Sequence, residues 1–187
     1  MKSFSNISEQ EKFWKGNFGD EYIGRDKLDS VASNTSFFSE IIGKTNNIRS
    51  ILELGCNIGN NLKAIKNIIP EAELHGVEIN SKAVEVLKKE GNFDVIESSI
   101  QDYSTNKTFD LVFTKTVLIH INPEDLKPVY KKIYDYSNKY IVIAEYYNPN
   151  PVSVTYRGNE EKLFKRDFAG DFMKMFPDVS LIDYGFK

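Results

Sequence analysis

The spacing of apolar residues changes near residue 48, and this change divides the chain into two parts. In residues 9–47 apolar positions recur every three or four residues, as they do in amphipathic helices. The first helical stretch carries an aromatic face, best explained by packing, that is formed by Phe13, Trp14, Phe18 and Tyr22. A second helix is expected over residues 31–45. The sequence therefore predicts a helical N-terminal extension, residues 1–47.

From residue 48 onward, short apolar runs alternate with helical stretches. Strands are expected over residues 50–55, 73–80, 93–100, 109–118, 139–147 and 179–187. Helices are expected over residues 60–70, 81–91, 122–137 and 165–177, with a turn-rich loop over residues 148–152. Strands that alternate with helices build parallel βαβ units with right-handed crossovers. We therefore expect one α/β domain, residues 1–187, in which a doubly wound, Rossmann-like and mostly parallel sheet occupies residues 48–187.

The composition narrows the range of partners. The chain has 187 residues, a net charge of -3 and one cysteine, Cys56. A nucleic-acid binder usually carries a basic stripe, so no nucleic-acid partner is expected. No apolar run approaches the roughly 18 residues that a membrane span needs, and the segment "MKSFSNISEQ" lacks the apolar region of a signal peptide. We expect a cytoplasmic protein with no membrane partner, and its oligomeric state stays open.

The segment "ILELGCNIGNNL", residues 51–62, joins an expected strand to an expected helix. Ligands of doubly wound sheets bind outside the carboxyl ends of the strands, where this segment lies. Gly55 and Gly59 allow a tight turn and a close approach of the backbone to a ligand. The helix that begins near Asn60 offers free N–H groups and the positive end of its dipole to an anion. These features predict a ligand with a carboxylate or phosphate near an adenosine-like group.

Two classes of cofactor compete for this segment. Dinucleotide-binding loops follow the pattern G-x-G-x-x-G, whereas here the glycines are four positions apart and Asn57 stands between them. S-adenosylmethionine is the alternative. It has no pyrophosphate, and the carboxylate of Glu53 near the end of the strand suits its positively charged end. The glycine spacing favours S-adenosylmethionine over a dinucleotide.

The ends of the next two expected strands carry further polar groups. Glu78 ends one strand, where a carboxylate can accept hydrogen bonds from both hydroxyls of a ribose. Residues 99–102 follow the next strand, where an adenine is expected, and Asp102 can accept a hydrogen bond from its exocyclic amine. Ile79 and Ile100 can flank the adenine ring.

Together these motifs resemble those of a known family. "ILELGCNIGNNL", "GVEIN" and "FDLVFTKTVLIHINPEDL" are similar to successive motifs of class I S-adenosylmethionine-dependent methyltransferases, over about residues 48–145. More narrowly, "FWKGNFGDEYIGRD", the asparagine of "GCNIGNN" and "EYYNPNPVSVTYRG...LFKRDFAG" resemble methyltransferases associated with pseudaminic acid biosynthesis, over nearly the whole chain. Asn57 replaces the usual glycine, but asparagine tolerates left-handed backbone better than most residues. The usual seventh, antiparallel strand has no counterpart, so either the sheet edge is reduced or the chain is truncated.

The resemblance implies S-adenosylmethionine as the cofactor, S-adenosylhomocysteine as the product, and no metal. The cofactor-binding residues that it implies are Tyr22, Arg25, Glu53, Gly55, Cys56, Asn57, Gly59, Asn60, Glu78, Ile79, Ser99, Ile100, Gln101, Asp102 and Lys115. Within this set, Arg25 is expected to pair with the carboxylate of the cofactor. Cys56 is expected to be a small buried contact and not a nucleophile.

The resemblance also implies O- or N-methyl transfer to a small anionic sugar of the nonulosonic-acid type, or to its nucleotide-activated form. His120 and Glu145 are the candidates for the general base. The residues expected to bind the acceptor are Tyr146 and Tyr147, as the pocket lining, and Arg157 and Arg166, as clamps for its charge. Two alternatives stay open: a methyltransferase for another small metabolite, and a non-catalytic protein that binds S-adenosylmethionine.

Overall fold

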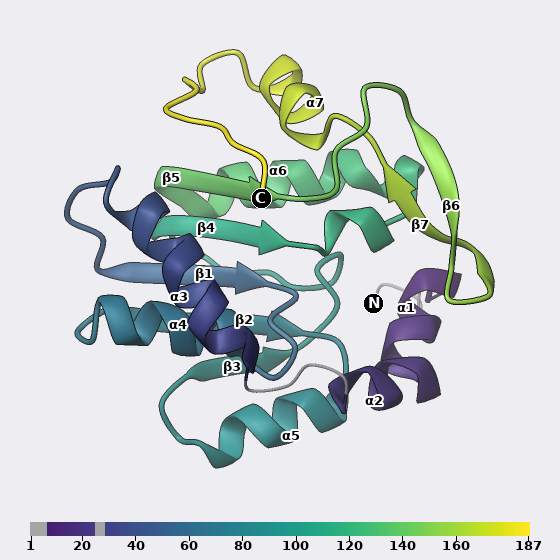
Figure 1. Cartoon of the computed structure of the whole chain (residues 1–187), viewed down its shortest axis with the longest axis horizontal. Helices are drawn as coiled ribbons and strands as arrows, with labels where there is room; N and C mark the ends of the chain where they lie inside the picture. The colour runs from purple at the N-terminus through teal and green to yellow at the C-terminus, as the bar shows by residue number, and fades with distance from the viewer. Residues whose placement is uncertain (1–6, 25–28) are drawn as a thin grey trace.

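Five parallel strands form the central sheet in the computed structural model (Figure 1). The structure describes residues 7–24 and 29–187. The strands of this sheet are β1 (Ser50–Leu54), β2 (Glu73–Glu78), β3 (Asp94–Glu97), β4 (Phe109–Lys115) and β5 (Ser137–Ala144). They lie in the order β3-β2-β1-β4-β5, so the direction in which strands are added reverses between β1 and β4, the place where ligands of such sheets bind. The predicted doubly wound, parallel fold class is confirmed.

Helices cover both faces of the sheet (Figure 1). Those before β5 are α1 (Glu9–Lys15), α2 (Asn17–Ile23), α3 (Asp29–Ile42), α4 (Asn60–Ile68), α5 (Ser81–Lys89), two short 3-10 helices η1 (Leu118–His120) and η2 (Pro123–Asp125), and α6 (Leu126–Tyr136). The last described helix is α7 (Phe168–Met175). The predicted helical extension is therefore present before β1, as three helices.

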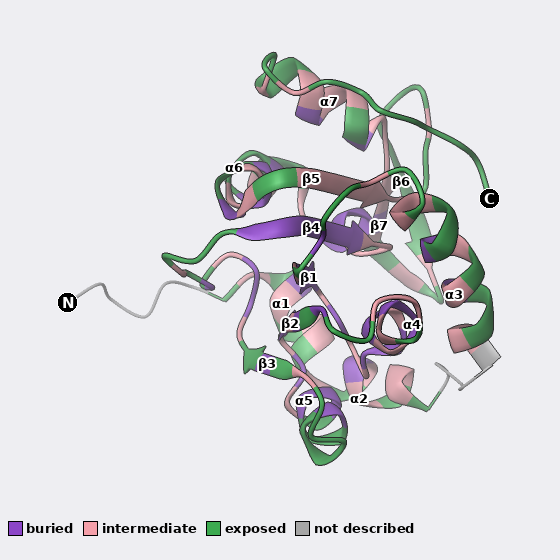
Figure 2. Ribbon diagram, turned by 90° about the vertical axis from the view of Figure 1, so that its left-hand side faces the viewer, coloured by how far each residue is buried: buried purple, intermediate pink, exposed green. Residues whose placement is uncertain are grey.

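The alternation of side chains along each strand divides the core into two clusters. Ile51 of β1 packs in the cluster that includes residues of α3, α4 and α5. The next residue, Leu52, packs in the cluster that includes residues of α6 and α7. Strand β4 is buried along nearly its whole length, as Figure 2 shows, because both faces of this inner strand are covered. This rigid centre fixes the carboxyl ends of β1 and β4.

The segment between β5 and α7 differs from its prediction. Residues 153–164, for which no strand was predicted, lie within an antiparallel hairpin formed by β6 (Val152–Tyr156) and β7 (Asn159–Lys165). The expected loop and helix overlap this hairpin only at Val152 and Lys165. In Figure 1 the hairpin stands beside α1. The side-chain amide of Gln10 in α1 donates a hydrogen bond of 2.9 Å to the backbone carbonyl of Glu161 in β7. This hydrogen bond joins α1, the first described helix, to β7 of the hairpin.

The strand expected over residues 179–187 is wrong, and the described residues contain neither a sixth nor a seventh strand in the main sheet. Tyr184 and Phe186 are each 77% exposed. Asp183 forms an ion pair with Lys44, just past the end of α3. The apolar alternation in this segment suits a strand, but a strand also needs a neighbour on which to pair and pack.

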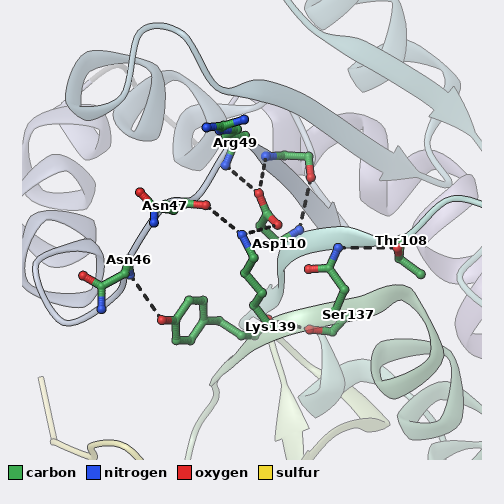
Figure 3. Close-up of polar contacts among 10 residues, drawn as sticks. Asn46, Asn47, Arg49, Thr108, Asp110, Ser137 and Lys139 are labelled. Atoms are coloured by element: carbon green, nitrogen blue, oxygen red, sulfur yellow. Dashed lines mark hydrogen bonds and ion pairs between the residues drawn. The ribbon is translucent and has the colours of Figure 1, made fainter.

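The amino ends of β1, β4 and β5 are joined by a polar network centred on Asp110 (Figure 3). Its Oδ2 accepts the backbone N–H of Arg49 at 2.7 Å, and its Oδ1 lies 2.8 Å from the ammonium of Lys139. The hydrogen bond from Lys139 lowers the pKa of Asp110 from its ordinary value. This network aligns the strands at the end of the sheet opposite the candidate site.

Candidate functional site

A cavity of about 250 Å³ lies outside the carboxyl ends of β1, β2 and β4. Helices α1 and α2, the start of α3, and the loops after these strands line it. The residues expected to bind a cofactor that line it are Tyr22, Gly55, Asn57, Asn60, Glu78, Ile79, Ser99, Ile100, Gln101 and Lys115. The topology therefore brings together groups that lie between residues 22 and 115 of the sequence.

The loop after β1 has the glycine geometry that its sequence predicts. Gly55 has a φ of 82°, and a Cβ on it would lie 2.6 Å from Cγ2 of Val117. Gly59 has a φ of 74°, and a Cβ on it would lie 2.5 Å from Cδ1 of Leu87. Asn57 also has a left-handed backbone, with a φ of 47°, a conformation that asparagine adopts more readily than most residues. Close packing and left-handed backbone both select small or permissive residues here.

Glu78 is held at the edge of the cavity by backbone donors. Its Oε2 accepts the N–H of Asn57 at 2.7 Å, and its Oε1 accepts the N–H of Asn80 at 2.8 Å. Burial raises the pKa of Glu78, and these hydrogen bonds oppose the rise. A carboxylate has about four acceptor positions, so the fixed carboxylate of Glu78 keeps acceptor capacity for a ligand.

Four residues expected to bind a cofactor are not part of the cavity lining. Glu53 is fully buried and accepts a 2.6 Å hydrogen bond from the side-chain amide of Asn61. Cys56 packs against Gly76, where a Cβ would lie 2.6 Å from its sulfur, and burial raises the pKa of its thiol. Gly59 packs on Leu87, and Asp102 is exposed. Arg25 lies outside the described residues.

His120 lies on the cavity wall, within the short helix η1. Its Nδ1 lies 2.7 Å from the backbone carbonyl of Lys162, and because a carbonyl only accepts, Nδ1 carries the proton. Its ring centroid is 4.5 Å from that of Trp14 and 4.9 Å from that of Tyr156. Burial lowers the pKa of His120 to about 4. The ring is therefore neutral near pH 7, with Nε2 as a hydrogen-bond acceptor.

Glu145 does not face the cavity, contrary to expectation. Its Oε1 accepts the backbone N–H groups of Val117 and Leu118 at 3.1 and 3.0 Å, and its Oε2 accepts that of Ile119 at 3.4 Å. Burial raises the pKa of Glu145 to about 7. The carboxylate thus caps the helix that carries His120, because the free N–H groups at a helix start need acceptors.

The residues expected to bind the acceptor also lie away from the cavity lining. Tyr146 and Tyr147 follow β5 and are 51% and 49% exposed. Arg157 occupies the tip of the β6–β7 hairpin, with its guanidinium 5.8 Å from the ring centroid of Tyr156. The guanidinium of Arg166 lies 3.6 Å from the carboxylate of Asp171 in α7. None of these four residues lines the cavity, so their role in binding an acceptor stays a prediction.

Two aromatic residues near the site were missed as functional candidates. Trp14 was expected only to pack, yet it lines the cavity. Tyr156 lies in a segment for which no strand was predicted, yet it contacts His120. A signal for the hairpin was present, because two runs of strand-like alternation flank Arg157 and Gly158, and glycine next to a turn residue is typical of hairpins.

Comparison with known proteins supports the fold. A family model described as "Methyltransferase domain" matches residues 51–139. No curated protein sequence matches the chain. Within residues 7–24 and 29–187, no helix has the length and apolar character needed to cross a membrane.

Several solved structures share this architecture. The plantazolicin methyltransferase BpumL in complex with SAH has a TM-score of 0.60 and 19% identity, over 74% of this chain and 57% of that one. Streptomyces venezuelae DesVI has a TM-score of 0.57 and 15% identity, over 75% and 64%. An O-methyltransferase from a trans-AT PKS multienzyme of Brevibacillus brevis, in complex with S-adenosyl-L-homocysteine, has a TM-score of 0.58 and 13% identity, over 87% of this chain and 56% of that one.

These similarities establish the fold class and no more. The identities of 13–19% are low, and this chain spans less than two thirds of each of these three structures. The five parallel strands in the order β3-β2-β1-β4-β5, with helices on both faces, form the core of a class I methyltransferase fold. The cavity lies where that fold binds its ligand, at the reversal of strand order.

Proposed function

We propose that the protein binds S-adenosylmethionine in this cavity and transfers its methyl group to a small acceptor. One observation carries the proposal: the cavity at the reversal of strand order brings together the Gly55 turn, Glu78 and the segment after β3. The match of residues 51–139 to the methyltransferase model supports it. The relatives crystallised with S-adenosylhomocysteine support the choice of cofactor.

Each part of the cavity suits one part of the cofactor. The turn at Gly55 and Asn57 lets the backbone approach the amino-acid end. Glu78 accepts hydrogen bonds from the ribose hydroxyls. Ile79 and Ile100 flank the adenine, and the polar residues Ser99 and Gln101 surround its edge.

Glu53, Cys56 and Gly59 do not line the cavity and act through other residues. Glu53 bonds Asn61 and so orients a side chain that does line it. Cys56 and Gly59 shape the turn by packing closely against Gly76 and Leu87. Tyr22, Asn60 and Lys115 stay in the proposed set as wall residues, the last as a cation.

The acceptor is proposed to be a small anionic sugar of the nonulosonic-acid type, or its nucleotide-activated form. The support is the sequence resemblance, which spans nearly the whole chain and includes the residues of α1 and of the hairpin. Lys115 lines the cavity and supplies a positive charge for an anionic group. Arg157 and Arg166 reach such an acceptor only if it extends beyond the cavity.

The protein supplies position and proton transfer, because S-adenosylmethionine already carries an activated methyl group. We assign the role of proton acceptor to His120, whose neutral ring lies on the cavity wall. We assign Glu145 to holding η1, since its carboxylate is bonded to the backbone of that helix. In-line transfer requires reacting atoms about 3 to 3.5 Å apart, so small displacements of η1 should slow the reaction.

Isothermal titration calorimetry tests the cofactor assignment. We expect S-adenosylhomocysteine to bind and NAD to give no measurable heat. Tight binding of NAD without binding of S-adenosylhomocysteine would refute the proposal. Binding of S-adenosylhomocysteine without turnover on any sugar nucleotide would instead favour the non-catalytic alternative or a different small metabolite.

A further inference from the structure

Three aromatic rings from distant parts of the chain meet beside the cavity, and two of them, those of Trp14 and His120, line it in a part that the cofactor roles leave unused. Trp14 comes from α1, His120 from η1 and Tyr156 from β6. The ring centroid of His120 is 4.5 Å from that of Trp14 and 4.9 Å from that of Tyr156, and the two outer rings are 6.4 Å apart. We call these three residues the aromatic wall.

Trp14 places an unused hydrogen-bond donor on this wall. Its indole Nε1 is buried, and no residue in the described ranges 7–24 and 29–187 accepts its proton. A buried indole N–H usually has a partner, since an unpaired one loses its bonds to water without replacement. Trp14 also lines the cavity, so an oxygen atom of a bound ligand can supply the missing acceptor.

His120 places a hydrogen-bond acceptor next to that donor. The bond of its Nδ1 to the carbonyl of Lys162 fixes the tautomer, which leaves the lone pair of Nε2 available. Among the described residues, the structure shows no hydrogen bond to Nε2. The wall therefore offers one donor and one acceptor from two rings in direct contact.

We propose that Trp14 Nε1 and His120 Nε2 together bind the acceptor hydroxyl of the methyl-receiving sugar, so that the protein is an O-methyltransferase. This inference rests on the proposed function. A hydroxyl both donates and accepts, and it satisfies the two groups at once. A neutral amine has a single lone pair, which must attack the methyl carbon and so cannot also accept the Trp14 proton, and a carboxylate only accepts, so it meets the lone pair of His120 with another lone pair.

The transfer balances with these groups alone. The hydroxyl oxygen forms a bond to the methyl carbon while the carbon–sulfur bond breaks, and the electron pair of that bond returns to sulfur as a neutral thioether. The hydroxyl proton passes to Nε2 of His120 and then to solvent. The hydroxyl becomes strongly acidic as its oxygen bonds to carbon, so a weakly basic imidazole is sufficient to take the proton.

The test uses the only tryptophan of the chain, Trp14, as a built-in reporter. Protein saturated with S-adenosylhomocysteine is titrated with N-acetylneuraminic acid up to about 10 mM, where even a site with a millimolar Kd fills. We expect a saturable change in tryptophan fluorescence and a matching Kd by calorimetry. No binding of the sugar acid to this complex would overturn the inference.

Variants then locate the bound hydroxyl. Trp14→Phe keeps an aromatic ring but removes the N–H, and His120→Asn removes the ring acceptor. Each should weaken binding of N-acetylneuraminic acid about tenfold by calorimetry, the scale of one lost hydrogen bond. Phe13→Leu changes a neighbouring ring outside the cavity lining and should leave that affinity within about twofold. Unchanged affinity in both wall variants would overturn the inference.

Two further measurements separate this inference from the proposed function. S-adenosylhomocysteine should bind Trp14→Phe within about twofold of the unmodified protein, which shows that the variant is folded. Loss of cofactor binding by the unmodified protein would refute the proposed function, whereas cofactor binding without sugar binding would refute only the acceptor site. A methylated product that carries the new methyl group on nitrogen would overturn the assignment of a hydroxyl acceptor.

Discussion

The carboxylate of Glu145 caps the short helix that carries His120, and the two side chains are perturbed in opposite directions. Glu145 accepts three backbone N–H groups at the start of η1, and burial raises its pKa from 4.5 to about 7. Burial lowers the pKa of His120 from 6.5 to about 4. Both groups therefore favour their neutral forms in the folded protein, and their effects on stability oppose each other between pH 4.5 and 6.5.

The first prediction concerns stability against pH. The contribution of Glu145 to the free energy of unfolding is fully present below pH 4.5 and is lost as the pH rises through about 7. The contribution of His120 is fully present above pH 6.5 and is lost as the pH falls through about 4. His120→Asn lacks the contribution of His120, which grows as the pH rises from 4.5 to 6.5. The stability of this variant relative to the unmodified protein should therefore fall over that range. In Glu145→Gln the relative stability should rise over the same range.

Urea denaturation at a series of pH values measures both slopes. Shifts of this size correspond to changes on the order of 3 kcal/mol across the window, since one pKa unit is about 1.4 kcal/mol. Other titrating groups contribute equally to the three proteins, so the difference curves isolate the two residues. Difference curves that are flat for both variants would show that neither group is buried as the structure has it.

The second prediction concerns Glu78. Its carboxylate is fixed by backbone donors at the cavity edge, and charge-assisted hydrogen bonds to a ribose contribute about 1.5–3 kcal/mol each. Glu78→Ala should weaken the binding of S-adenosylhomocysteine at least about tenfold by calorimetry. Asp102→Ala serves as the matched control. Its side chain is exposed and outside the cavity lining, so its Kd should change by less than about twofold.

A reversed outcome would be equally clear. If Asp102→Ala weakens the cofactor while Glu78→Ala does not, the nucleoside lies further along the sheet edge, and the assignment of the ribose to Glu78 fails.

The central sheet was predictable because its signals are local. The runs that end at Leu54, Glu78 and Lys115 are short and apolar, and helical spacing separates them. The turn at Gly55 follows from the rarity of left-handed backbone in residues with a Cβ. Once parallel pairing is assumed, the gathering of Gly55 and Glu78 at one edge follows from topology alone.

The rest depends on contacts between segments far apart in sequence. Trp14 belongs to the site only because α1 is docked on the hairpin, through Gln10 and Glu161. The capping role of Glu145 depends on how the loop after β4 folds back on β5. Residues 179–187 carry the alternation of a strand, but alternation does not tell whether a neighbouring strand is present to pair with.

The third prediction concerns the polar network at the opposite end of the sheet. Asp110→Asn removes the ion pair with Lys139 and weakens the acceptor for the N–H of Arg49. We expect a loss of about 2 kcal/mol in the free energy of unfolding, as for hydrogen bonds to a charged group. Because Lys139 lowers the pKa of Asp110, this contribution is present above the ordinary pKa of 3.8 and is lost as the pH falls further.

Calorimetry supplies the control for that variant. The network lies at the amino ends of the strands, away from the cavity, so the Kd for S-adenosylhomocysteine should stay within about twofold. A stability unchanged above pH 5 would mean that the network in Figure 3 contributes nothing measurable.

The fourth prediction tests whether the turn after β1 and the helix η1 are packed as one unit. Gly55 has a φ of 82°, and a Cβ on it would meet Cγ2 of Val117 at 2.6 Å and Cγ1 at 2.9 Å. Gly55→Ala should therefore destabilise the protein through both backbone strain and this clash, by about 1–3 kcal/mol.

Val117→Ala removes the two clashing methyl groups but leaves the backbone strain in place. The double variant should therefore be more stable than the sum of the single effects by about 1 kcal/mol, the coupling expected for residues in contact. The free energies of unfolding of the four proteins, measured by urea denaturation, give this coupling directly.

Gly59→Ala provides a control, because its Cβ would meet Leu87 instead, and its effect should add to that of Val117→Ala without coupling. Additive effects of Gly55→Ala and Val117→Ala would show that the turn and η1 move independently, and the position of His120 would then not depend on the cofactor loop.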